Sequence, residues 1–280
     1  MYQILNKKIL NPYVSLLEVE APLIAKKAQP GQFVILRVND AGERIPLTIA
    51  DYDRDKGSIT VIFQIVGATT KKLNQLQAGD CLHDFVGPLG RPTKLEGLKK
   101  VAVVGGGVGC AIAYPIAKKL HSMGCCVHSV IGFRSKELVI LEDKFTQVSD
   151  LCEIMTDDGS CGEKGLVTHA LDRLIQAGNT YDEVFVIGPL PMMKFVCLLT
   201  KPYGIKTTAS MNPIMIDGTG MCGGCRLTVG GKTKFACVDG PDFDGHEIDF
   251  DEAIFRSNIY KEKEHHDYEA TCNLLNKEVE

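Results

Sequence analysis

Four side chains that can bind iron or zinc lie in one glycine-rich segment near the C-terminus. They are Asp217, Cys222, Cys225 and Cys237, which are separated by four, two and eleven residues. A plant-type 2Fe–2S site has the spacing C-x4-C-x2-C and a more distant fourth cysteine, because a short loop must wrap the cluster and direct several thiolates inward. Here a carboxylate occupies the first position of that pattern. The spacing therefore predicts a 2Fe–2S cluster with Asp217 as one of its four ligands.

Two other interpretations of this segment stay open. Zinc also accepts three thiolates and one carboxylate in a tetrahedral site, so the same side chains could form a zinc knuckle. The cysteines could also lie in an ordinary loop that binds no metal. The nearby glycines favour a cluster, since their exposed backbone N–H groups can donate hydrogen bonds to cluster sulfur atoms; they are Gly218, Gly220, Gly223 and Gly224.

The remaining eight of the eleven cysteines are scattered along the chain. An odd total without paired spacing does not indicate a disulfide framework. We therefore predict a reducing, cytoplasmic location, and we predict that most of these eight cysteines are small buried hydrophobic residues.

A cation and a hydroxyl lie four residues apart in the N-terminal third of the chain. Arg44 and Thr48 belong to the run Arg-Ile-Pro-Leu-Thr at the end of a predicted strand, after Pro30-Gly31-Gln32-Phe33. They could contact a pyrophosphate and a flavin ring respectively, although a solvated arginine on a strand is the more common situation. The segment from Gly67 to Thr70 begins a predicted helix, where free N–H groups and hydroxyls suit a phosphate. A simple helix N-cap is the alternative there.

A glycine-rich turn follows the first strong apolar run in the middle of the chain. The run Gly105-Gly106-Gly107-Val108-Gly109 ends a predicted strand and opens a helix, which is the context of a dinucleotide phosphate turn. Its match to G-x-G-x-x-G is partial. No acidic residue ends the next strand, where Arg134 could accept a 2′-phosphate, so the choice between NAD and NADP stays open.

Two further loops follow predicted parallel strands. One contains Asp158 and Gly159, and the other runs from Gly188 through Pro189 to Met192 and Met193. Open α/β sheets bind ligands at the carboxyl ends of their strands, so both loops are candidate nucleotide contacts. Either could instead be a tight strand-to-helix turn.

The elements that must position these groups fall into four segments. Residues 1–98 contain short β-branched runs separated by turn residues, which predict a small antiparallel β-barrel. Residues 99–209 alternate strands and helices, which predicts a parallel sheet covered on both faces. Residues 210–247 form a small cysteine-rich unit with few core-forming residues, which would need its metal to hold its shape. The charged sequence of residues 248–280, with its sparse apolar positions, predicts a surface helix that docks on a partner.

Composition excludes several classes of protein. The chain has 280 residues and a net charge of −4, and it lacks a basic patch with interleaved aromatic residues, so we predict no nucleic-acid partner. No apolar run reaches about 18 residues, so we predict no membrane span. The N-terminal sequence enters strand-like alternation at once and lacks the features of a signal peptide.

The order of these motifs resembles a known family. Residues 1–209, with the Arg44–Thr48 run, the Gly105–Gly109 turn and the Gly188–Met193 loop, resemble the ferredoxin–NADP reductase superfamily. With the C-terminal unit, the chain resembles the branch that contains the electron-transfer subunits of dihydroorotate dehydrogenase B. Those subunits normally have four cysteines in the loop. Asp217 in first position is more similar to the small (alpha) subunits of NADH-dependent reduced ferredoxin:NADP oxidoreductases, also called the sulfide dehydrogenase alpha subunit type.

The resemblance implies binding residues for each cofactor. FAD would be held by Arg44, Pro46, Leu47, Thr48, Gln64, Val66, Gly67, Thr69 and Thr70, with the Thr48 hydroxyl near flavin N5 as the group closest to the chemistry. NAD(H), with NADP(H) not excluded, would lie over Gly105, Gly106, Gly107, Val108, Gly109, Arg134, Asp158, Gly159, Gly188, Pro189, Met192 and Met193. The 2Fe–2S cluster would be held by Asp217, Cys222, Cys225 and Cys237.

The same resemblance implies a function. The chain would exchange hydride between NAD(H) and FAD and pass electrons through the cluster to a larger flavoprotein iron–sulfur subunit, which is linked to NADP and ferredoxin and performs electron bifurcation. One alternative is the electron-transfer subunit of dihydroorotate dehydrogenase B itself. An alternative from another class is a zinc-stabilised nucleotide-sensing module without redox activity.

Overall fold

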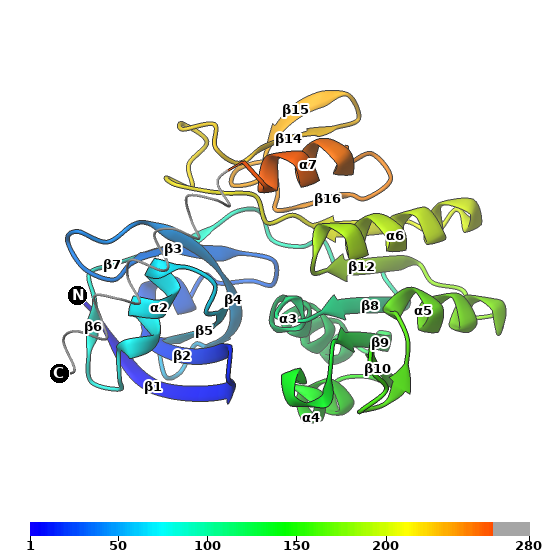
Figure 1. The fold of residues 1–280 in the computed structure, drawn as a ribbon, viewed down its shortest axis with the longest axis horizontal. Helices are drawn as coiled ribbons and strands as arrows, with labels where there is room; N and C mark the ends of the chain where they lie inside the picture. The colour runs from blue at the N-terminus through cyan, green and yellow to red at the C-terminus, as the bar shows by residue number, and fades with distance from the viewer. Residues whose placement is uncertain (260–280) are drawn as a thin grey trace.

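A computed structural model describes residues 1–259, and its N-terminal part is a rolled antiparallel sheet (Figure 1). The strand order is β6-β1-β2-β5-β4-β3-β7, and the two edge strands β6 and β7 are separated only by His83, so the sheet curls almost into a closed barrel. Its interior is filled by alternate side chains such as Leu17, Val34, Ile49 and Phe63. The elements are β1 (Tyr2–Asn11), β2 (Val14–Glu20), α1 (Pro22–Ala25), β3 (Phe33–Arg37), β4 (Ile45–Asp53), β5 (Ser58–Gln64), α2 (Ala68–Gln75), β6 (Cys81–Leu82) and β7 (Asp84–Leu89).

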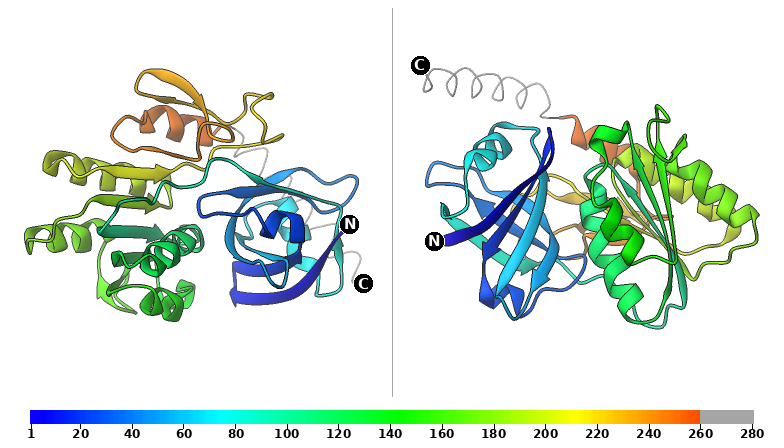
Figure 2. Two further views of the ribbon diagram at one scale, coloured as in Figure 1. Left: turned by 180° about the vertical axis from the view of Figure 1, so that it is seen from behind. Right: turned by 90° about the horizontal axis from the view of Figure 1, so that it is seen from below.

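The second part is an α/β domain built on a mainly parallel sheet of order β11-β10-β9-β8-β12-β13-β16. Its central strand β8 is buried from Val101 to Gly106, because helices cover both faces of a parallel sheet and leave no solvent side. Figures 1 and 2 show this domain beside the barrel, with α3 between the two. The elements are β8 (Lys100–Gly106), α3 (Gly109–Ser122), β9 (Cys126–Phe133), η1 (Lys136–Leu138), α4 (Glu142–Gln147), β10 (Leu151–Thr156), β11 (Glu163–Lys164), α5 (Val167–Gln176), β12 (Glu183–Ile187), α6 (Leu190–Thr200), η2 (Lys201–Tyr203) and β13 (Thr207–Ser210).

The C-terminal unit consists of a hairpin, one short strand and one helix. These are β14 (Arg226–Val229), β15 (Lys232–Phe235), β16 (Asp242–Asp244) and α7 (Phe250–Ser257). Strand β16 pairs antiparallel with β13, so the unit adds an edge strand to the sheet of the α/β domain. The sequence did not predict this pairing. Of the predicted docking segment 248–280, the structure describes residues 248–259, which include α7, whereas residues 260–280 lie outside the described residues.

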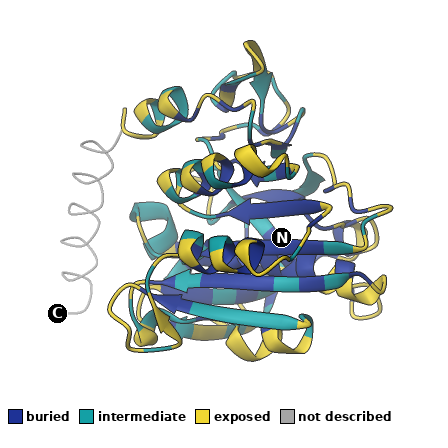
Figure 3. Cartoon of the chain, turned by 90° about the vertical axis from the view of Figure 1, so that its right-hand side faces the viewer, coloured by how far each residue is buried: buried dark blue, intermediate teal, exposed yellow. Residues whose placement is uncertain are grey.

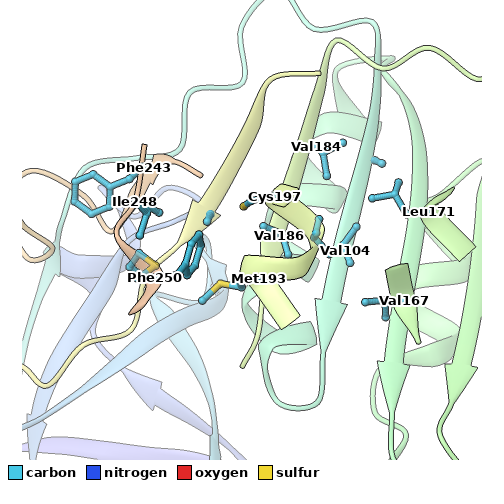
Figure 4. Close-up of a cluster of buried hydrophobic side chains, with 14 of the residues drawn as sticks. Val104, Val167, Leu171, Val184, Val186, Met193, Cys197, Phe243, Ile248 and Phe250 are labelled. Atoms are coloured by element: carbon cyan, nitrogen blue, oxygen red, sulfur yellow. The ribbon is translucent and has the colours of Figure 1, made fainter. Parts of the chain in front are cut away.

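One hydrophobic core joins all three parts. It includes Phe33 and Ile35 of the barrel, Val104 and Met193 of the α/β domain, and Phe250 of the C-terminal unit. The burial map shows dark interior strands beneath exposed helix faces (Figure 3). Figure 4 shows the side chains of the C-terminal unit packed beside α6 and the central strands. The predicted combination of flavin-type barrel, parallel sheet and cluster unit is therefore confirmed.

The prediction about the scattered cysteines was wrong in part. Among residues 1–259, Cys110, Cys125 and Cys197 are buried, but Cys81 is exposed and the other three are half-buried. Cys81 lies on the two-residue edge strand β6, where little of the barrel covers it. In the described residues, no helix is both long and apolar enough to cross a membrane.

Candidate functional site

The hairpin β14–β15 brings two of the predicted cluster ligands together. Cys225 directly precedes β14 and Cys237 follows β15 by one residue, so the register that pairs Arg226 with Phe235 places the two cysteines side by side. Their Sγ atoms lie 3.2 Å apart, and the Cys237 N–H donates to Cys225 Sγ at 3.5 Å. Both thiols are buried, and this burial together with the adjacent thiol raises the pKa of Cys237. A bound cation would reverse that tendency, since a coordinated thiol loses its proton.

The other two predicted ligands are more accessible, since Asp217 is half-buried and Cys222 is exposed. The Asp217 carboxylate accepts hydrogen bonds from the Thr219 N–H at 2.6 Å, from the Thr219 hydroxyl and from the Cys222 N–H at 2.8 Å. These bonds, led by that of the Thr219 side chain, hold the pKa of Asp217 far below its usual range. The residue is therefore a carboxylate, which is the form that binds metals. The Cys222 Sγ atom accepts from the Gly224 N–H at 3.5 Å, in the way that glycine amides support cluster sulfur ligands.

The four groups are arranged as two pairs, which suits a two-iron cluster. A structural zinc needs four ligands around one centre. Among residues 1–259, no three His, Cys, Asp or Glu side chains converge closely enough to hold one ion. The four groups form a buried thiol pair, Cys225 with Cys237, and a more accessible pair, half-buried Asp217 with exposed Cys222. Two pairs on one loop match a cluster with two metal atoms, each of which takes two protein ligands.

The cluster loop is seated on the barrel. A Cβ atom at Gly218, where φ is +78°, would lie 2.9 Å from Leu89 Cδ1 and 3.0 Å from Ile35 Cγ1, so only glycine permits this approach. Arg44 Nε donates to the Ile216 carbonyl at 3.3 Å, next to Asp217 in sequence. The loop after β7 adds a second attachment, because Arg91 Nε donates to the Val238 carbonyl at 2.9 Å.

The predicted flavin run lies directly beneath this loop. Strand β4 pairs with β3 so that Thr48 faces Phe33, Leu47 faces Val34 and Pro46 faces Ile35. Ile35 is the same residue that Gly218 contacts. The structure therefore brings the Arg44–Thr48 run and the cluster loop to one region of the barrel.

The predicted phosphate segment on α2 is partly engaged with its own helix. The Thr70 hydroxyl accepts from the N–H groups of Val66 and Gly67, both at 3.0 Å, which is the role of a residue that caps a helix. The Thr69 hydroxyl donates to Glu43 Oε2 at 2.9 Å. Thr70 thus matches the N-cap alternative, whereas the side chains of Gln64 and Val66 at the end of β5 are exposed.

The glycine turn and the Gly188 loop meet at the carboxyl ends of neighbouring strands. Strand β8 pairs in parallel with β12, and Gly105 lies opposite Ile187. A Cβ atom at Gly109 would lie 2.6 Å from the Ile187 carbonyl oxygen and 2.7 Å from Gly188 Cα, so the helix α3 can begin here only with glycine. The Met192 side chain covers Gly106.

The side chain of one predicted nucleotide-binding residue, Met193, is not accessible to a nucleotide. Met193 is fully buried in the core between α6 and the sheet (Figure 4), because the turn of the helix that places Met192 over Gly106 directs the next residue inward. Any contact of Met193 with a nucleotide would therefore involve its backbone. Pro189 is exposed at the start of α6, and Val108 is half-buried at the start of α3.

The last predicted nucleotide residues lie at the ends of β9 and β10. The Asp158 N–H donates to the Arg134 carbonyl at 3.3 Å, so these two loops are adjacent. Asp158 Oδ1 accepts from the Ser160 N–H and hydroxyl at 2.9 and 2.6 Å, and these bonds, the hydroxyl first, lower the pKa of Asp158. Gly159 has a φ of +79°, which the turn requires. Arg134 is exposed.

Sequence reasoning missed one residue of this region. Asp242 on β16 accepts from the Thr93 hydroxyl at 2.6 Å, and its other oxygen Oδ1 is buried without a partner among the described residues. Thr93 belongs to the segment between the barrel and β8, and it also lies against Gly31. Asp242 therefore stands where the barrel, the connecting segment and the C-terminal unit meet. An acidic residue in a Gly-Pro-Asp-Phe-Asp run carries no signal of this position.

Comparison with known proteins agrees with this geometry. The iron–sulfur cluster binding domain of dihydroorotate dehydrogenase B matches residues 212–249. A dihydroorotate dehydrogenase B (NAD(+)) electron-transfer subunit homolog from Thermotoga maritima is 47% identical over 90% of this chain and 88% of its own length. The corresponding electron-transfer subunit of Fusobacterium nucleatum is 31% identical over 84% of this chain and 92% of its own length.

A solved structure covers almost the whole chain. A chain of the NADH-dependent reduced ferredoxin-NADP oxidoreductase, studied for flavin-based electron bifurcation, superposes with a TM-score of 0.91 at 44% identity and covers 96% of this chain and 97% of its own. The cytochrome b5 reductase domain of Ulva prolifera nitrate reductase superposes with a TM-score of 0.59 at 16% identity, a likeness of fold alone.

Proposed function

Because the chain belongs to the family of dihydroorotate dehydrogenase B electron-transfer subunits, we propose that it passes electrons between NAD(H) and a larger flavoprotein subunit. The path would run from NAD(H) through FAD on the barrel to a 2Fe–2S cluster held by Asp217, Cys222, Cys225 and Cys237. FAD, when bound, would supply the conversion between hydride and single-electron chemistry.

The observation that carries this proposal is the contact between the cluster loop and the barrel. Gly218 packs on Ile35 and Leu89, and Arg44 holds the Ile216 carbonyl. Since Ile35 pairs with Pro46 of the proposed flavin run, the cluster loop lies next to the strand that would carry the flavin ring. A residue in that run would serve both cofactors, because Arg44 can contact a pyrophosphate while its Nε stabilises the loop.

The residues of the α/β domain would orient the nucleotide. The N-terminus of α3 begins at the edge of the sheet where the Gly188 loop and the Arg134 and Asp158 loops also lie, and a helix N-terminus favours a phosphate. Thr48 would donate or accept a hydrogen bond near flavin N5, and no acid or base of the protein is needed for hydride transfer.

We propose a transhydrogenase-type partner linked to NADP and ferredoxin, rather than a dihydroorotate-oxidising partner. Asp217 supports this choice, together with the extensive likeness to the NADH-dependent reduced ferredoxin-NADP oxidoreductase. The partner that co-purifies with the chain distinguishes the two alternatives. A barrel subunit that binds flavin mononucleotide would favour the dihydroorotate enzyme.

The test uses the purified chain loaded with FAD, iron and sulfide. NADH added without oxygen should bleach the flavin absorbance, and a cluster signal should then appear in electron paramagnetic resonance spectra. A fully loaded chain whose flavin does not respond to NADH would refute the hydride role. A colourless protein that contains zinc and no acid-labile sulfide would support the nucleotide-sensing alternative instead.

A further inference from the structure

Four cationic side chains line one pocket between the barrel and α3. The pocket has a volume of about 400 Å³, and its cations are Lys26, Lys27, Arg54 and Lys119. No carboxylate lines it, although the chain carries a net charge of −4. The segment that follows α1 and the helix α3 both line the pocket, so it lies between them. Positive charge is thus concentrated in a concave site of an acidic chain.

The cations come from both domains. Lys26 and Lys27 follow α1, and Arg54 follows β4, so three of them belong to the barrel. Lys119 belongs to α3 of the α/β domain. Beside the pocket, Lys118 pairs with Asp51 at 2.7 Å and fixes α3 against β4. The two walls of the pocket are thus held at a defined separation.

The charges in the pocket are not neutralised by the protein. Arg54 Nη2 donates to the Ala28 carbonyl at 3.1 Å, and its guanidinium carbon lies 4.9 Å from the centre of the Tyr52 ring. These contacts orient the guanidinium but leave its charge and its other N–H groups available. Within residues 1–259, none of the four cations forms an ion pair.

Of the acidic residues near Arg54 in the sequence, none lines the pocket: Asp55 lies outside it, and Asp51 and Asp53 have partners elsewhere. The Asp51 carboxylate is paired with Lys118. Asp53 Oδ1 accepts from the N–H groups of Asp55 and Lys56 at 3.0 and 2.9 Å, so that oxygen shapes the turn after β4.

We propose that this pocket binds a small polyanion that carries a di- or triphosphate group. Arg54 supplies a planar fork that matches phosphate oxygens, and the three lysines supply mobile point charges. A pocket of this volume is in the range of small-molecule sites, and its concavity favours a small ligand over the surface of an acidic protein. Because both domains contribute cations, the bound polyanion would hold the barrel and the α/β domain together.

The site is separate from the proposed nucleotide phosphate turn. That turn lies at Gly109, at the start of α3, whereas Lys119 lies ten residues further along the same helix. Ten residues span about 15 Å along a helix axis. The proposal therefore does not rest on the proposed function, and it holds whether or not the chain oxidises NADH.

Calorimetric titration with inorganic pyrophosphate tests the proposal. The FAD-loaded protein is kept in saturating NAD⁺, so that the nucleotide site is occupied. We expect saturable one-site binding that is weakened at least about tenfold in the double variant Lys26→Gln/Lys119→Gln, since two charge-assisted contacts are lost. The matched control Lys8→Gln/Lys232→Gln removes two exposed lysines outside the pocket and should bind as the parent does.

A second measurement on the unaltered protein does not depend on how the variants fold. Pyrophosphate should protect Lys27 and Lys119 from acetylation by an amine-reactive reagent, as read by peptide mass spectrometry, and should leave Lys8 and Lys232 unprotected. Orthophosphate and ATP, titrated in parallel, establish whether two phosphates are required and whether a nucleoside adds affinity. Absence of saturable pyrophosphate binding, or an equal loss in the pocket and control variants, would overturn the proposal.

Discussion

Replacing Gly218 by alanine tests whether the cluster loop must sit on the barrel. The substitution has two costs. An alanine at a φ of +78° is strained by about 1–2 kcal/mol. Its Cβ would also lie 2.9 Å from Leu89 and 3.0 Å from Ile35, and overpacking of this kind costs about 1–3 kcal/mol more.

Gly231 provides the matched control for this substitution. It has a φ of +69° in the β14–β15 hairpin, and no atom lies within 4 Å of its Cβ position, so Gly231→Ala carries the backbone strain alone. The difference between the two variants isolates the contact with the barrel. About 1–3 kcal/mol of differential free energy lowers the ratio of seated to displaced loops by about 5- to 150-fold.

The assay is anaerobic stopped-flow mixing of each loaded variant with NADH, followed by freezing for electron paramagnetic resonance. We expect the flavin to bleach at the parental rate in both variants, because neither substitution lies in the Arg44–Thr48 run or in the nucleotide loops and the clash at Gly218 can be relieved by displacement of the cluster loop. Appearance of the reduced cluster should be slower in Gly218→Ala than in Gly231→Ala, since a displaced loop lengthens the electron path. Equal cluster reduction in the two variants would refute the argument that this contact places the cluster beside the flavin.

Three further predictions concern single side chains. Asp217→Cys should retain a 2Fe–2S cluster with an altered midpoint potential in a spectroscopic redox titration, because a thiolate replaces a carboxylate; an unchanged spectrum and potential would show that Asp217 is no ligand. Arg44→Ala should weaken FAD binding by roughly tenfold or more in fluorescence titration, through the loss of a charged contact, and should broaden the cluster signal because the Ile216 carbonyl loses its donor; intact FAD binding and an unchanged signal would contradict this role. Burial raises the pKa of Asp242 to about 6, so its contribution to folding stability is fully present below its unfolded pKa of about 4 and is lost as pH rises through 6. Asp242→Asn should therefore raise the melting temperature relative to the parent at neutral pH more than it does near pH 4, and an equal shift at both pH values would argue against a buried titrating carboxyl.

Much of the architecture followed from local patterns in the sequence. Alternating β-branched runs predicted the barrel, and continuous apolar strands followed by helices predicted the parallel sheet. The glycine turn at Gly105–Gly109 was recognisable because its spacing is fixed by the close approach of a strand, a helix and a neighbouring loop. The candidate cluster ligands could be proposed from the sequence because their separations of four, two and eleven residues are short and local.

The remaining features depend on contacts between distant segments. Nothing near Gly218 in the sequence indicates that it packs on Ile35, and nothing near Asp242 indicates that it meets Thr93. Strand β16 is three residues long and contains two aspartates, so its pairing with β13 is set by the closure of the C-terminal unit rather than by strand propensity. The side-chain direction of Met193 likewise depends on the rotation of α6 over the sheet.

The pairing of β16 with β13 has a consequence for how this chain can be divided. A protein cut after residue 209 would keep its barrel and its nucleotide loops, but β13 would become an open sheet edge with unpaired N–H and C=O groups. Such an edge is a template for association with another chain. Phe33, Ile35 and Met193 would also lose the apolar cover that Phe250 and its neighbours provide. The cluster unit thus covers a sheet edge in addition to its proposed role in electron transfer, and its removal should yield an aggregating fragment instead of a simpler reductase.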